Sequence, residues 1–531
     1  MYSKEFQQSL QAVEAAREKN VAYEPARMTA KEKEDLLAAY HPDYKQSEFA
    51  ELSIGPNKGD KVPHELCEML QAHSRIDAED IDLEDVTYDV DVLIIGGGGA
   101  GSAAAIEAHE AGANVMIVTK LRIGDANTMM AEGGIQAADK PNDSPAIHFV
   151  DAFGGGHFAA KRDLLAKLVC DAPEAIQWLN GLGVEFDKTE DGTMVTTHGG
   201  GTSRKRMHAA KDYSGAEIMR TLRDEVLNRG ITVVDFTSAI ELILDENGKA
   251  AGAVLMNMET MELMVARAKT VIIATGGAGR MHYQGFPTSN HYGATADGLV
   301  LGYRVGAKLL YAETLQYHPT GAAFPSQIFG ALVTEKVRSL GAKLVNAKGE
   351  VFMHPLETRD VAAASIIREC SDRANGVDTG AGFGVWLDTP MIEKIGGEGT
   401  IEKRIPAMMR MFGKYGIDIR KEPILVYPTL HYQNGGLDID PDCMTAVPGL
   451  YAAGEVVGGI HGRNRLMGNS LLDIIVFGRI AGQKSAERAK SAVPGTLTLA
   501  HVDAFEKELA DAGITADTVS PKLLPDYTRK V

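Results

Sequence analysis

The sequence has few cysteines and none of the paired spacings that hold a metal ion or an iron–sulfur cluster. Its four cysteines, Cys67, Cys170, Cys370 and Cys443, lie far apart, and no CxxC pair is present. This spacing excludes an iron–sulfur cluster or a structural zinc bound by this chain alone, and it is typical of a reducing compartment. We interpret all four as ordinary core thiols, and we expect a cytoplasmic protein without a metal site.

Long apolar runs and an excess of basic residues are also missing. No stretch reaches the roughly 18 apolar residues of a membrane-spanning helix, and the first residues, MYSKEFQQSL, contain no apolar signal core. The net charge is −18, whereas a nucleic-acid-binding protein needs a basic face. We expect neither a membrane span nor a nucleic-acid partner. Small anions stay possible ligands of a locally basic cleft, and contact with the inner membrane would run through partner subunits.

The chain is long enough for more than one core. It has 531 residues, of which 44% are hydrophobic and 24% charged, as in a globular protein of two or three domains. Composition divides it into a polar extension, a nucleotide-binding domain in two parts, a capping domain inserted between these parts, and a tail. The predicted boundaries, in that order, are 1–87, 88–316 with 431–490, 317–430, and 491–531.

The extension over 1–87 has a helical pattern and no recognisable chemistry. "EFQQSLQAVEAAREKN" is amphipathic, and "TAKEKEDLLAAY" begins with a capping box in which Thr29 and Glu32 satisfy each other's free donors. "IGPNKGDKVPH" contains two prolines and two glycines, which predicts a linker. We interpret the extension as a docking arm that packs on the main body or on a partner subunit.

A nucleotide-binding pattern begins at Tyr88, in "DVDVLIIGGGGAGSAAAIEAHEAGANVMIVTK". Its continuous Val, Ile and Leu strands are typical of a parallel sheet covered by helices. Gly96, Gly98 and Gly101 form G-x-G-x-x-G at the strand–helix turn, where glycines let the backbone approach a pyrophosphate at the helix N-terminus. The second strand ends in "IVTK", without an acidic residue for the ribose of NAD. This ending favours FAD.

Two later segments support FAD as the cofactor. A matching strand and glycine turn, "TVIIATGGAG", lies at 270–279, and another buried strand precedes Glu455 in "GLYAAGEVV". A carboxylate at Glu455 is placed to accept hydrogen bonds from ribityl hydroxyls. The helix "SLLDIIVFGRIAG" begins at Ser470, and its positive end suits negative charge on a reduced flavin. We predict one nucleotide-binding domain assembled from distant segments.

The loop "GDANTMMAEGG" at 124–134 has neither a helical period nor the alternation of a strand. With "IIGGGGAGSAAAIEA", "YHPTG", "VTEKVR", "ETRD", "TLHYQNGG", "GLYAAGE" and "HGRNRLMGNSLLD", it resembles the flavoprotein subunit of succinate dehydrogenase and fumarate reductase, a family that also contains L-aspartate oxidase. The resemblance covers about 88–490. It implies an α/β fold with a two-dinucleotide-type FAD-binding domain and an inserted α+β capping domain, to which we add the helical N-terminal extension.

In this family the loop packs against the flavin, and in the respiratory enzymes it carries a histidine bonded covalently to it. Asn127 occupies that position here and cannot form the bond. We therefore expect non-covalent FAD, which favours fumarate reduction over succinate oxidation. The residues predicted to bind FAD are Gly96, Gly98, Gly99, Ala100, Gly101, Thr119, Lys120, Asn127, Thr128, Glu132, Gly133, Gly134, Ala239, Thr275, Gly276, Asp297, Glu455, Asn469, Ser470 and Leu471.

A dicarboxylate needs two anchoring clusters and one acid, and the resemblance assigns residues to each. His431 and Arg465 would hold one carboxylate, with Arg465 as a bidentate fork. His318 and Thr334 would hold and twist the other, which strains the substrate toward hydride acceptance. Each of these residues alone is more often structural.

The resemblance also assigns the proton donor. Flavin N5 would deliver a hydride to one alkene carbon, and Arg359 would give a proton to its neighbour. A guanidinium holds its proton to about pH 12 or above, so Arg359 needs immediate reprotonation. Glu335 and Arg338 can supply it, because they are three positions apart and neighbours if the segment is helical. A purely structural ion-pair network is the competing interpretation.

The leading interpretation is an FAD-dependent oxidoreductase that interconverts fumarate and succinate and receives electrons from an iron–sulfur subunit or another donor. L-aspartate oxidase is the first alternative, favoured by the Asn-Thr loop and by "SRKR" in "HGGGTSRKRMHAA". A non-catalytic electron-relay subunit is the second. Arg204 and Arg206 either line the approach to the site or pair at the surface, and we leave them outside the catalytic set.

Overall fold

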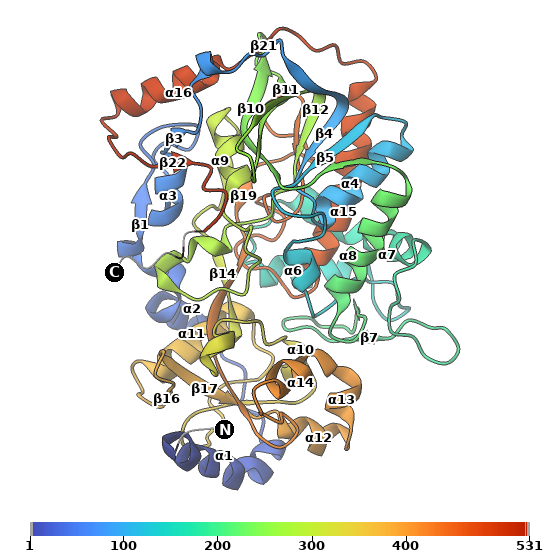
Figure 1. The fold of residues 1–531 in the computed structure, drawn as a ribbon. Helices are drawn as coiled ribbons and strands as arrows, with labels where there is room; N and C mark the ends of the chain where they lie inside the picture. Colours follow the sequence, from blue (N-terminus) through green and yellow to red (C-terminus); the bar gives the residue numbers. More distant parts are fainter. Residues whose placement is uncertain (1–3, 526, 528–531) are drawn as a thin grey trace.

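Two large hydrophobic cores and two smaller clusters form the molecule in the computed structural model, which describes residues 4–525 and residue 527. The larger core surrounds an eight-stranded sheet and the smaller one a five-stranded sheet (Figure 1). We call residues 49–317 with 430–525 the large body, and residues 322–426 the small body.

The sheet of the large body has a parallel half and an antiparallel half. The parallel strands are β4 (Val86–Ile95), β5 (Val115–Val118), β9 (Thr232–Val234), β12 (Leu263–Ile273) and β20 (Leu450–Ala452). The strands added in antiparallel fashion are β10 (Thr237–Asp245), β11 (Ala250–Asn257) and β21 (Leu497–Thr498). Distant segments thus form one sheet, as the sequence predicts, and β12 pairs with both β4 and β20.

The carboxyl ends of the parallel strands lie at one edge of this sheet. Ile95 pairs with both Val118 and Ile273, and Ile273 pairs with Ala452. β4 and β12 end in continuous Val, Ile and Leu residues that are buried. The loops that follow the strands therefore converge on one place, where open α/β sheets usually bind ligands.

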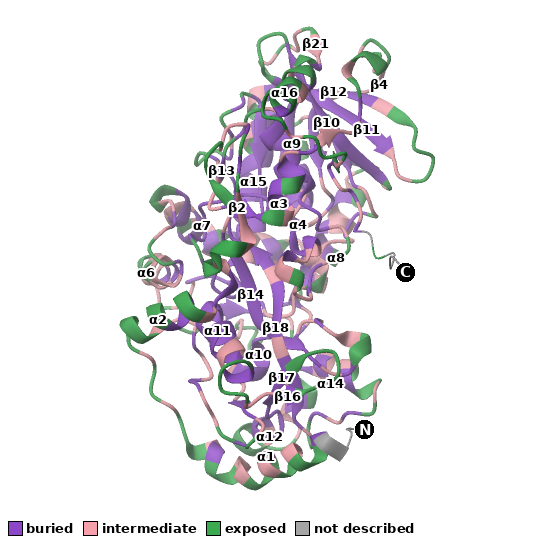
Figure 2. Cartoon of the chain, turned by 90° about the vertical axis from the view of Figure 1, so that its left-hand side faces the viewer, coloured by how far each residue is buried: buried purple, intermediate pink, exposed green. Residues whose placement is uncertain are grey.

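Helices α4 (Gly99–Glu110) and α15 (Asn469–Ala489) pack closely against each other beside this edge. Small residues permit the approach, because a Cβ at Gly482 would collide with the carbonyl of Ala104. Figure 2 shows the central strands and both helices buried. Other helices of the large body include α6 (Pro145–Gly155), α7 (Arg162–Gly181), α8 (Ser214–Asn228) and α9 (Asp297–Arg304).

Two long strands connect the bodies. β14 (Leu315–Ala322) and β18 (Ile424–Gln433) pair antiparallel and bury one end in each core. The sheet continues with β17 (Phe383–Leu387), β15 (Leu344–Val345) and β16 (Val377–Asp378). Its helices are α10 (Lys336–Ser339), α11 (Arg359–Cys370), α12 (Pro390–Gly396), α13 (Thr400–Arg404) and α14 (Pro406–Gly413).

The N-terminal segment runs along both bodies. Helix α1 (Lys4–Ala22) packs on the small body, and α2 (Ala30–Tyr40), which begins with the predicted capping box, packs on α11. The chain then reaches the large body through α3 (His64–Leu70), which contacts α9. The linker prediction for "IGPNKGDKVPH" was wrong in part, because a hairpin pairs β1 (Phe49–Glu51) with β2 (Lys61–Pro63).

The C-terminal segment folds back over the large body. Helix α16 (Ala500–Asp511) lies beside it, and β22 (Val519–Ser520) pairs in parallel with β3 (His73–Ser74). The short elements near the functional region are α5 (Asn127–Met130), β6 (Ile135–Gln136), β7 (Thr196–Thr197), β8 (Met207–His208), β13 (Leu309–Leu310) and β19 (Gly436–Leu437).

The short 3-10 helices complete the secondary structure. They are η1 (Pro42–Tyr44), η2 (Gln46–Glu48), η3 (Ala78–Asp80), η4 (Gly279–Met281), η5 (Tyr283–Gly285) and η6 (Ser326–Ile328). Over 4–525 and 527, no helix is both long and apolar enough for a bilayer, and no cluster of potential metal ligands occurs. Three cysteines are buried, but Cys170 is exposed on α7, so its prediction as a core thiol was wrong.

Candidate functional site

The glycine turn between β4 and α4 opens the site. Gly96 has φ +118, and a Cβ there would collide with the carbonyl oxygen of Ala274 in the second glycine turn. Gly98 is the N-cap of α4, and Gly101 contacts the carbonyl of Gly96, which also leaves no room for a side chain. The two turns therefore touch, and the free N–H groups of α4 face the space beyond them.

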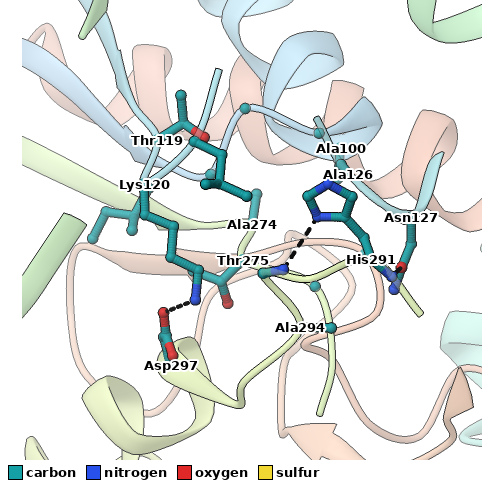
Figure 3. A pocket seen from close by; sticks show the side chains of 18 of the residues that line it. Ala100, Thr119, Lys120, Ala126, Asn127, Ala274, Thr275, His291, Ala294 and Asp297 are labelled. Atoms are coloured by element: carbon teal, nitrogen blue, oxygen red, sulfur yellow. Dashed lines mark hydrogen bonds and ion pairs between the residues drawn. The ribbon is translucent and has the colours of Figure 1, made fainter. Parts of the chain in front are cut away.

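A cavity of about 890 Å³ lies beyond these turns (Figure 3). Backbone from three strand ends lines it, together with polar side chains of the following loops. The predicted cofactor residues that line it are Gly96, Gly98, Gly99, Ala100, Thr119, Lys120, Asn127, Thr128, Ala239, Thr275, Gly276, Asp297 and Glu455. Gly101 and Asn469 do not line it: Gly101 packs inside the turn, and Asn469 Oδ1 accepts a hydrogen bond from His148 Nε2 (3.0 Å).

Lys120 forms the polar floor of this cavity. Its Nζ donates to Asp297 Oδ2 at 2.5 Å, to Thr295 Oγ1 at 2.7 Å and to the carbonyl oxygen of Leu523 at 2.5 Å. Burial lowers the pKa of Lys120, whereas the charge of Asp297 opposes this shift. The Leu523 contact places the C-terminal segment directly behind the cavity wall, which the sequence did not predict.

The loop 124–134 is tied to the glycine turn and to the third strand end. Thr128 Oγ1 accepts a hydrogen bond from the N–H of Gly99 (3.1 Å). The Asn127 amide donates to Asn290 Oδ1 (2.7 Å) and to Glu455 Oε2 (3.2 Å), and its oxygen accepts from the N–H of His291 (2.5 Å). Both ends of the Asn127 amide are thus occupied. The loop contains one helical turn, α5, where its sequence shows no period.

Two further cavities continue from the first. One, of about 540 Å³, shares Asn127, Thr128, Glu455 and Ile474 with it. The next, of about 370 Å³, shares His431 and Arg465 with the second cavity, and both lie beside Ser470 and Leu471 of α15. The three cavities therefore form one path from the strand ends to the junction of the two bodies.

The third cavity brings the predicted substrate residues together. His318 lies on β14 and His431 on β18, both where these strands pass between the bodies, and their rings are 5.0 Å apart. The predicted residues that line this cavity are Glu132, Gly133, Gly134, His318, Thr334, Glu335, Arg359, His431, Arg465, Ser470 and Leu471. Glu132, Gly133 and Gly134 thus line the third cavity and not the first.

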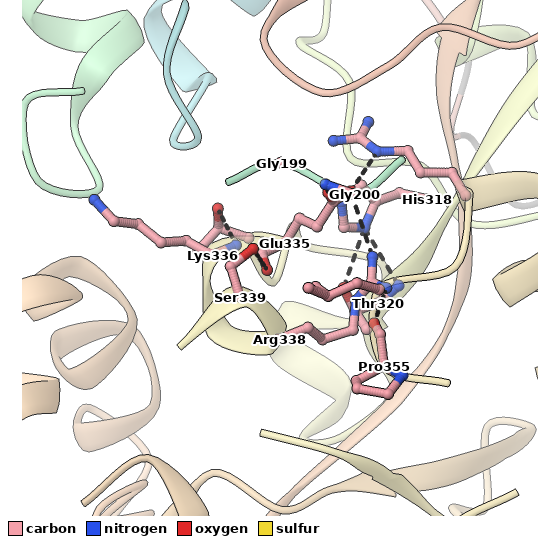
Figure 4. Close-up of polar contacts among 12 residues, drawn as sticks. Gly199, Gly200, His318, Thr320, Glu335, Lys336, Arg338, Ser339 and Pro355 are labelled. Carbon is pink, nitrogen blue, oxygen red and sulfur yellow. Dashed lines mark hydrogen bonds and ion pairs between the residues drawn. The ribbon is translucent and has the colours of Figure 1, made fainter. Parts of the chain in front are cut away.

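Arg359 and Glu335 form the centre of a buried ion-pair group, and Figure 4 shows Glu335 with the neighbouring Arg338. Arg359 Nε donates to Glu335 Oε2 at 2.9 Å, and Arg338 Nη2 lies 3.4 Å from the same oxygen. The other oxygen of Glu335 accepts from the N–H of Gly200 (2.6 Å). Burial opposes ionisation of Glu335, but Arg359 and Arg338 outweigh it and hold its pKa below the usual value. Arg338 does not line the cavity; it lies behind Glu335.

The two histidines are neutral hydrogen-bonding groups. Burial and then the charge of Arg359 lower the pKa of both His318 and His431. His318 Nδ1 accepts from the N–H of Thr320 (3.2 Å), so the proton of the neutral ring is on Nε2. His431 Nδ1 lies 2.7 Å from Ser289 Oγ. Both rings therefore keep Nε2 available for a ligand.

Positive charge dominates the third cavity. Arg359 and Arg465 are buried in its wall, and Arg465 stacks on Tyr432, with its guanidinium carbon 4.4 Å from the ring centre. Burial and the neighbouring Arg359 lower the pKa of Arg465 to about 9. Among the described residues, no carboxylate pairs with Arg465. A small anion would supply that missing charge.

Glu132 is the second carboxyl group of this cavity. Burial, and then the charge of Asp212, raise its pKa well above the usual value, and its Oε2 has no hydrogen-bond partner in the described part of the chain. The group is therefore neutral without a ligand. It does not cancel the positive charge of the arginines.

The basic segment at 198–210 divides between interior and surface. Arg206 is buried and pairs with Asp143 (2.7 Å) and Asp151 (2.6 Å), whereas Arg204 and His198 line an exposed hollow. Arg206 is therefore structural. The sequence missed Gln316, Asn290 and His291, because none of them belongs to a motif with a chemical signature.

Comparisons with known proteins agree with this geometry. A family described as "FAD binding domain" matches residues 91–471. An uncharacterised FAD-dependent oxidoreductase of Methanocaldococcus jannaschii is 41% identical, covering 75% of this chain and 72% of that protein. One of the subunits of the fumarate reductase (CoM/CoB) of Methanothermobacter marburgensis is 39% identical (77% and 74% covered), and the L-aspartate oxidase of Streptomyces coelicolor 36% (77% and 70%).

A solved structure with the same arrangement is the FrdA chain of a variant of Escherichia coli quinol fumarate reductase. It has a TM-score of 0.73 and 32% sequence identity, and the match covers 80% of this chain and 74% of that chain.

Proposed function

The chain belongs to the family of the fumarate reductase and succinate dehydrogenase flavoprotein subunits, FAD-dependent oxidoreductases that include L-aspartate oxidase, and from this premise we propose that it reduces fumarate to succinate. The observation that carries the proposal is the buried Arg359–Glu335–Arg338 group beside two neutral histidines and Arg465. Together these side chains could bind both carboxylates of a dianion and supply a proton to it.

The first two cavities fit FAD. The glycine turns and the N-terminus of α4 suit a pyrophosphate, and Glu455 is a buried acceptor in the wall shared by both cavities. When bound, FAD supplies the hydride chemistry of a flavin. We expect it to be held without a covalent bond, because Asn127 has no nucleophilic atom and its amide is fully hydrogen-bonded.

The third cavity would bind the two carboxylates of fumarate at opposite ends. His431 Nε2 and the Arg465 fork would hold one of them. His318 Nε2–H and the Thr334 hydroxyl would hold the other. The carboxylate at Arg465 would supply the negative charge that this buried guanidinium lacks. The buried wall would keep solvent away from the reacting carbons.

Arg359 would donate the proton that completes the reduction. Fumarate gains one hydride and one proton. We assign the proton to the Arg359 guanidinium, because Glu335 connects it to Arg338 behind the cavity wall. The new C–H bond takes a guanidinium proton. Glu335 would then pass a proton from Arg338 to Arg359, and solvent would restore the proton of Arg338. Arg338 lies behind Glu335 and holds this carboxylate in place. We further propose that electrons arrive from a partner subunit, because several relatives are themselves named as subunits.

The test uses the purified flavoprotein with reduced viologen as the electron donor. Fumarate-dependent oxidation of the viologen is expected, and Arg359→Ala should abolish it while the bound flavin spectrum persists. Near-normal turnover by Arg359→Ala would contradict the proposed acid.

L-aspartate oxidase is the second candidate, and Glu132 is the observation that favours it. An ammonium group needs an acidic partner, and Glu132 lies in the third cavity with an unpartnered oxygen. Incubation with L-aspartate and oxygen decides between the two. Production of iminoaspartate and hydrogen peroxide would favour the oxidase; turnover of fumarate alone would favour the reductase.

A further inference from the structure

Arg359 is held on two sides, and the proposed proton path explains only one of them. Its Nε binds Glu335, whereas its Nη1 donates to Gln316 Oε1 at 2.9 Å. No described residue accepts a hydrogen bond from Nη2, which leaves this end of the guanidinium for the cavity that Arg359 lines. The Gln316 contact therefore determines how the planar group is rotated.

Gln316 is the first member of a buried chain of hydrogen bonds. Its amide nitrogen donates to Asn464 Oδ1 (3.0 Å) and to the carbonyl oxygen of Arg465 (2.7 Å). The Asn464 amide nitrogen in turn donates to Asp360 Oδ1 (3.3 Å). Asp360 Oδ2 finally meets His157 Nε2 at 2.7 Å. Gln316, Asn464 and Asp360 are buried, and the His157 side chain is 40% exposed.

This chain of hydrogen bonds joins four separate segments of the fold. Gln316 lies on β14, Asp360 on α11, Asn464 in the loop before α15, and His157 after α6. His157 has φ +59, a left-handed conformation that residues other than glycine rarely adopt. Such a conformation persists only where surrounding contacts hold it, and the Asp360 contact is the one its side chain makes.

The ionised Asp360 determines which atom donates and which accepts in each hydrogen bond of this series. A carboxylate only accepts hydrogen bonds, so Asp360 requires the amide nitrogen of Asn464. The Asn464 oxygen then faces Gln316, and the Gln316 oxygen faces Arg359. An amide neither gains nor loses a proton readily, so the chain orients Arg359 but does not relay protons to it.

We propose that Gln316, Asn464, Asp360 and His157 are positioning residues, which hold the Arg359 guanidinium with Nη2 toward the substrate. The proposal rests on the proposed function, because Arg359 must be the acid for its orientation to matter. It adds a second support to the Glu335 contact, and it extends the catalytic group to a side chain at the surface.

Other ionisable groups surround Asp360 and His157. Burial lowers the pKa of His41 to about 4, so this ring is neutral. Burial also raises the pKa of Asp43 well above its usual value. Arg463, Tyr44 and Glu313 are the remaining neighbours. The hydrogen bond to Asp360 raises the pKa of His157.

The test compares Asp360→Asn with Asp372→Asn in the flavin-loaded protein. Asp372 lies just beyond the end of α11, where it accepts from Tyr40 and has no place in the chain. For Asp360→Asn, we expect kcat for fumarate reduction to fall about tenfold or more with KM changed less than about threefold, because misorientation of an acid affects the chemical step. The solvent isotope effect on kcat should rise. Asp372→Asn should leave all three values unchanged.

His157 provides a second comparison that does not disturb the interior. His157→Gln keeps a donor for Asp360 and should keep kcat near the wild-type value, whereas His157→Ala should lower kcat and leave flavin binding intact. Wild-type kcat in both His157→Ala and Asp360→Asn, with Arg359→Ala inactive, would overturn the positioning chain and leave the proposed function standing. Full activity of Arg359→Ala would overturn both.

Discussion

Glu335 Oε2 lies 2.9 Å from Arg359 Nε, and both side chains are almost completely buried at the junction of the two bodies. The pair is not isolated, since Gly200 binds the other oxygen of Glu335 and Arg338 lies behind it. A carboxylate with this many donors stays ionised despite its burial. It is also the nearest group that can exchange a proton with Arg359.

Glu335→Gln should lower kcat for fumarate reduction by about a hundredfold or more, because the amide cannot return a proton to Arg359. KM should change little, since Glu335 faces the arginines. Viologen-coupled kinetics measure both values. Glu350→Gln is the matched control, because Glu350 accepts from Asn346 (3.0 Å) in the small body away from the cavity. Wild-type kcat in Glu335→Gln would contradict its role.

Flavin should be released into the supernatant when the wild-type protein is precipitated with acid. Asn127→Ala removes three hydrogen bonds from the loop, so the Kd of FAD should rise about tenfold. Titration of the apoprotein with FAD, followed by quenching of flavin fluorescence, measures this change. Asn142→Ala, in the exposed hollow, is the control. Flavin that stays in the precipitate would show that another residue forms a covalent link.

Removal of residues 519–531 should speed FAD dissociation about tenfold, because Lys120 and Thr295 lose the Leu523 carbonyl that holds them behind the cavity. Dilution of the loaded protein with flavin fluorescence as the signal gives the rate. A chain shortened only by residues 528–531 is the comparison and should release FAD at the wild-type rate. Equal rates for all three proteins would show that the segment does not support the cavity.

The stability contributed by His157 should depend on pH. Its pKa is raised in the folded state by Asp360, so the stabilisation is fully present below the unfolded pKa of about 6.5 and is lost as pH rises through the folded pKa. The Tm difference between wild type and His157→Ala should therefore be larger at pH 6 than at pH 9. A Tm difference that grows with pH would contradict the ion pair with Asp360.

The sequence was sufficient for the parts of the site that local spacing encodes. The spacing of Gly96 and Gly98 after a strand predicts a turn, and the helical spacing of Glu335 and Arg338 predicts their contact. The strand motifs also predicted one nucleotide-binding domain assembled from distant segments, and β4, β12 and β20 do share a sheet. Each of these inferences needs only neighbouring residues or a pattern of strands.

The hydrogen-bond network around Arg359 could not be predicted in this way. Gln316, Asn464 and His157 are ordinary polar residues, and only the three-dimensional path of four elements brings them together. The cavity that Glu132 lines could not be predicted for a similar reason, because the course of its loop decides where the side chain lies. The hairpin within the predicted linker depends on pairing between β1 and β2, to which glycine and proline content gives no guide.

The route of helix α1 has a consequence during synthesis. Ser9 binds the carbonyl of Ala347, which lies 338 positions later, and it accepts from Trp386, which lies 377 positions later. At about 5–20 residues per second, a ribosome needs on the order of tens of seconds to make these partners. Phe6 and Val13 lack their core partners for that time, so helix α1 packs in its final place only after the small body has been made.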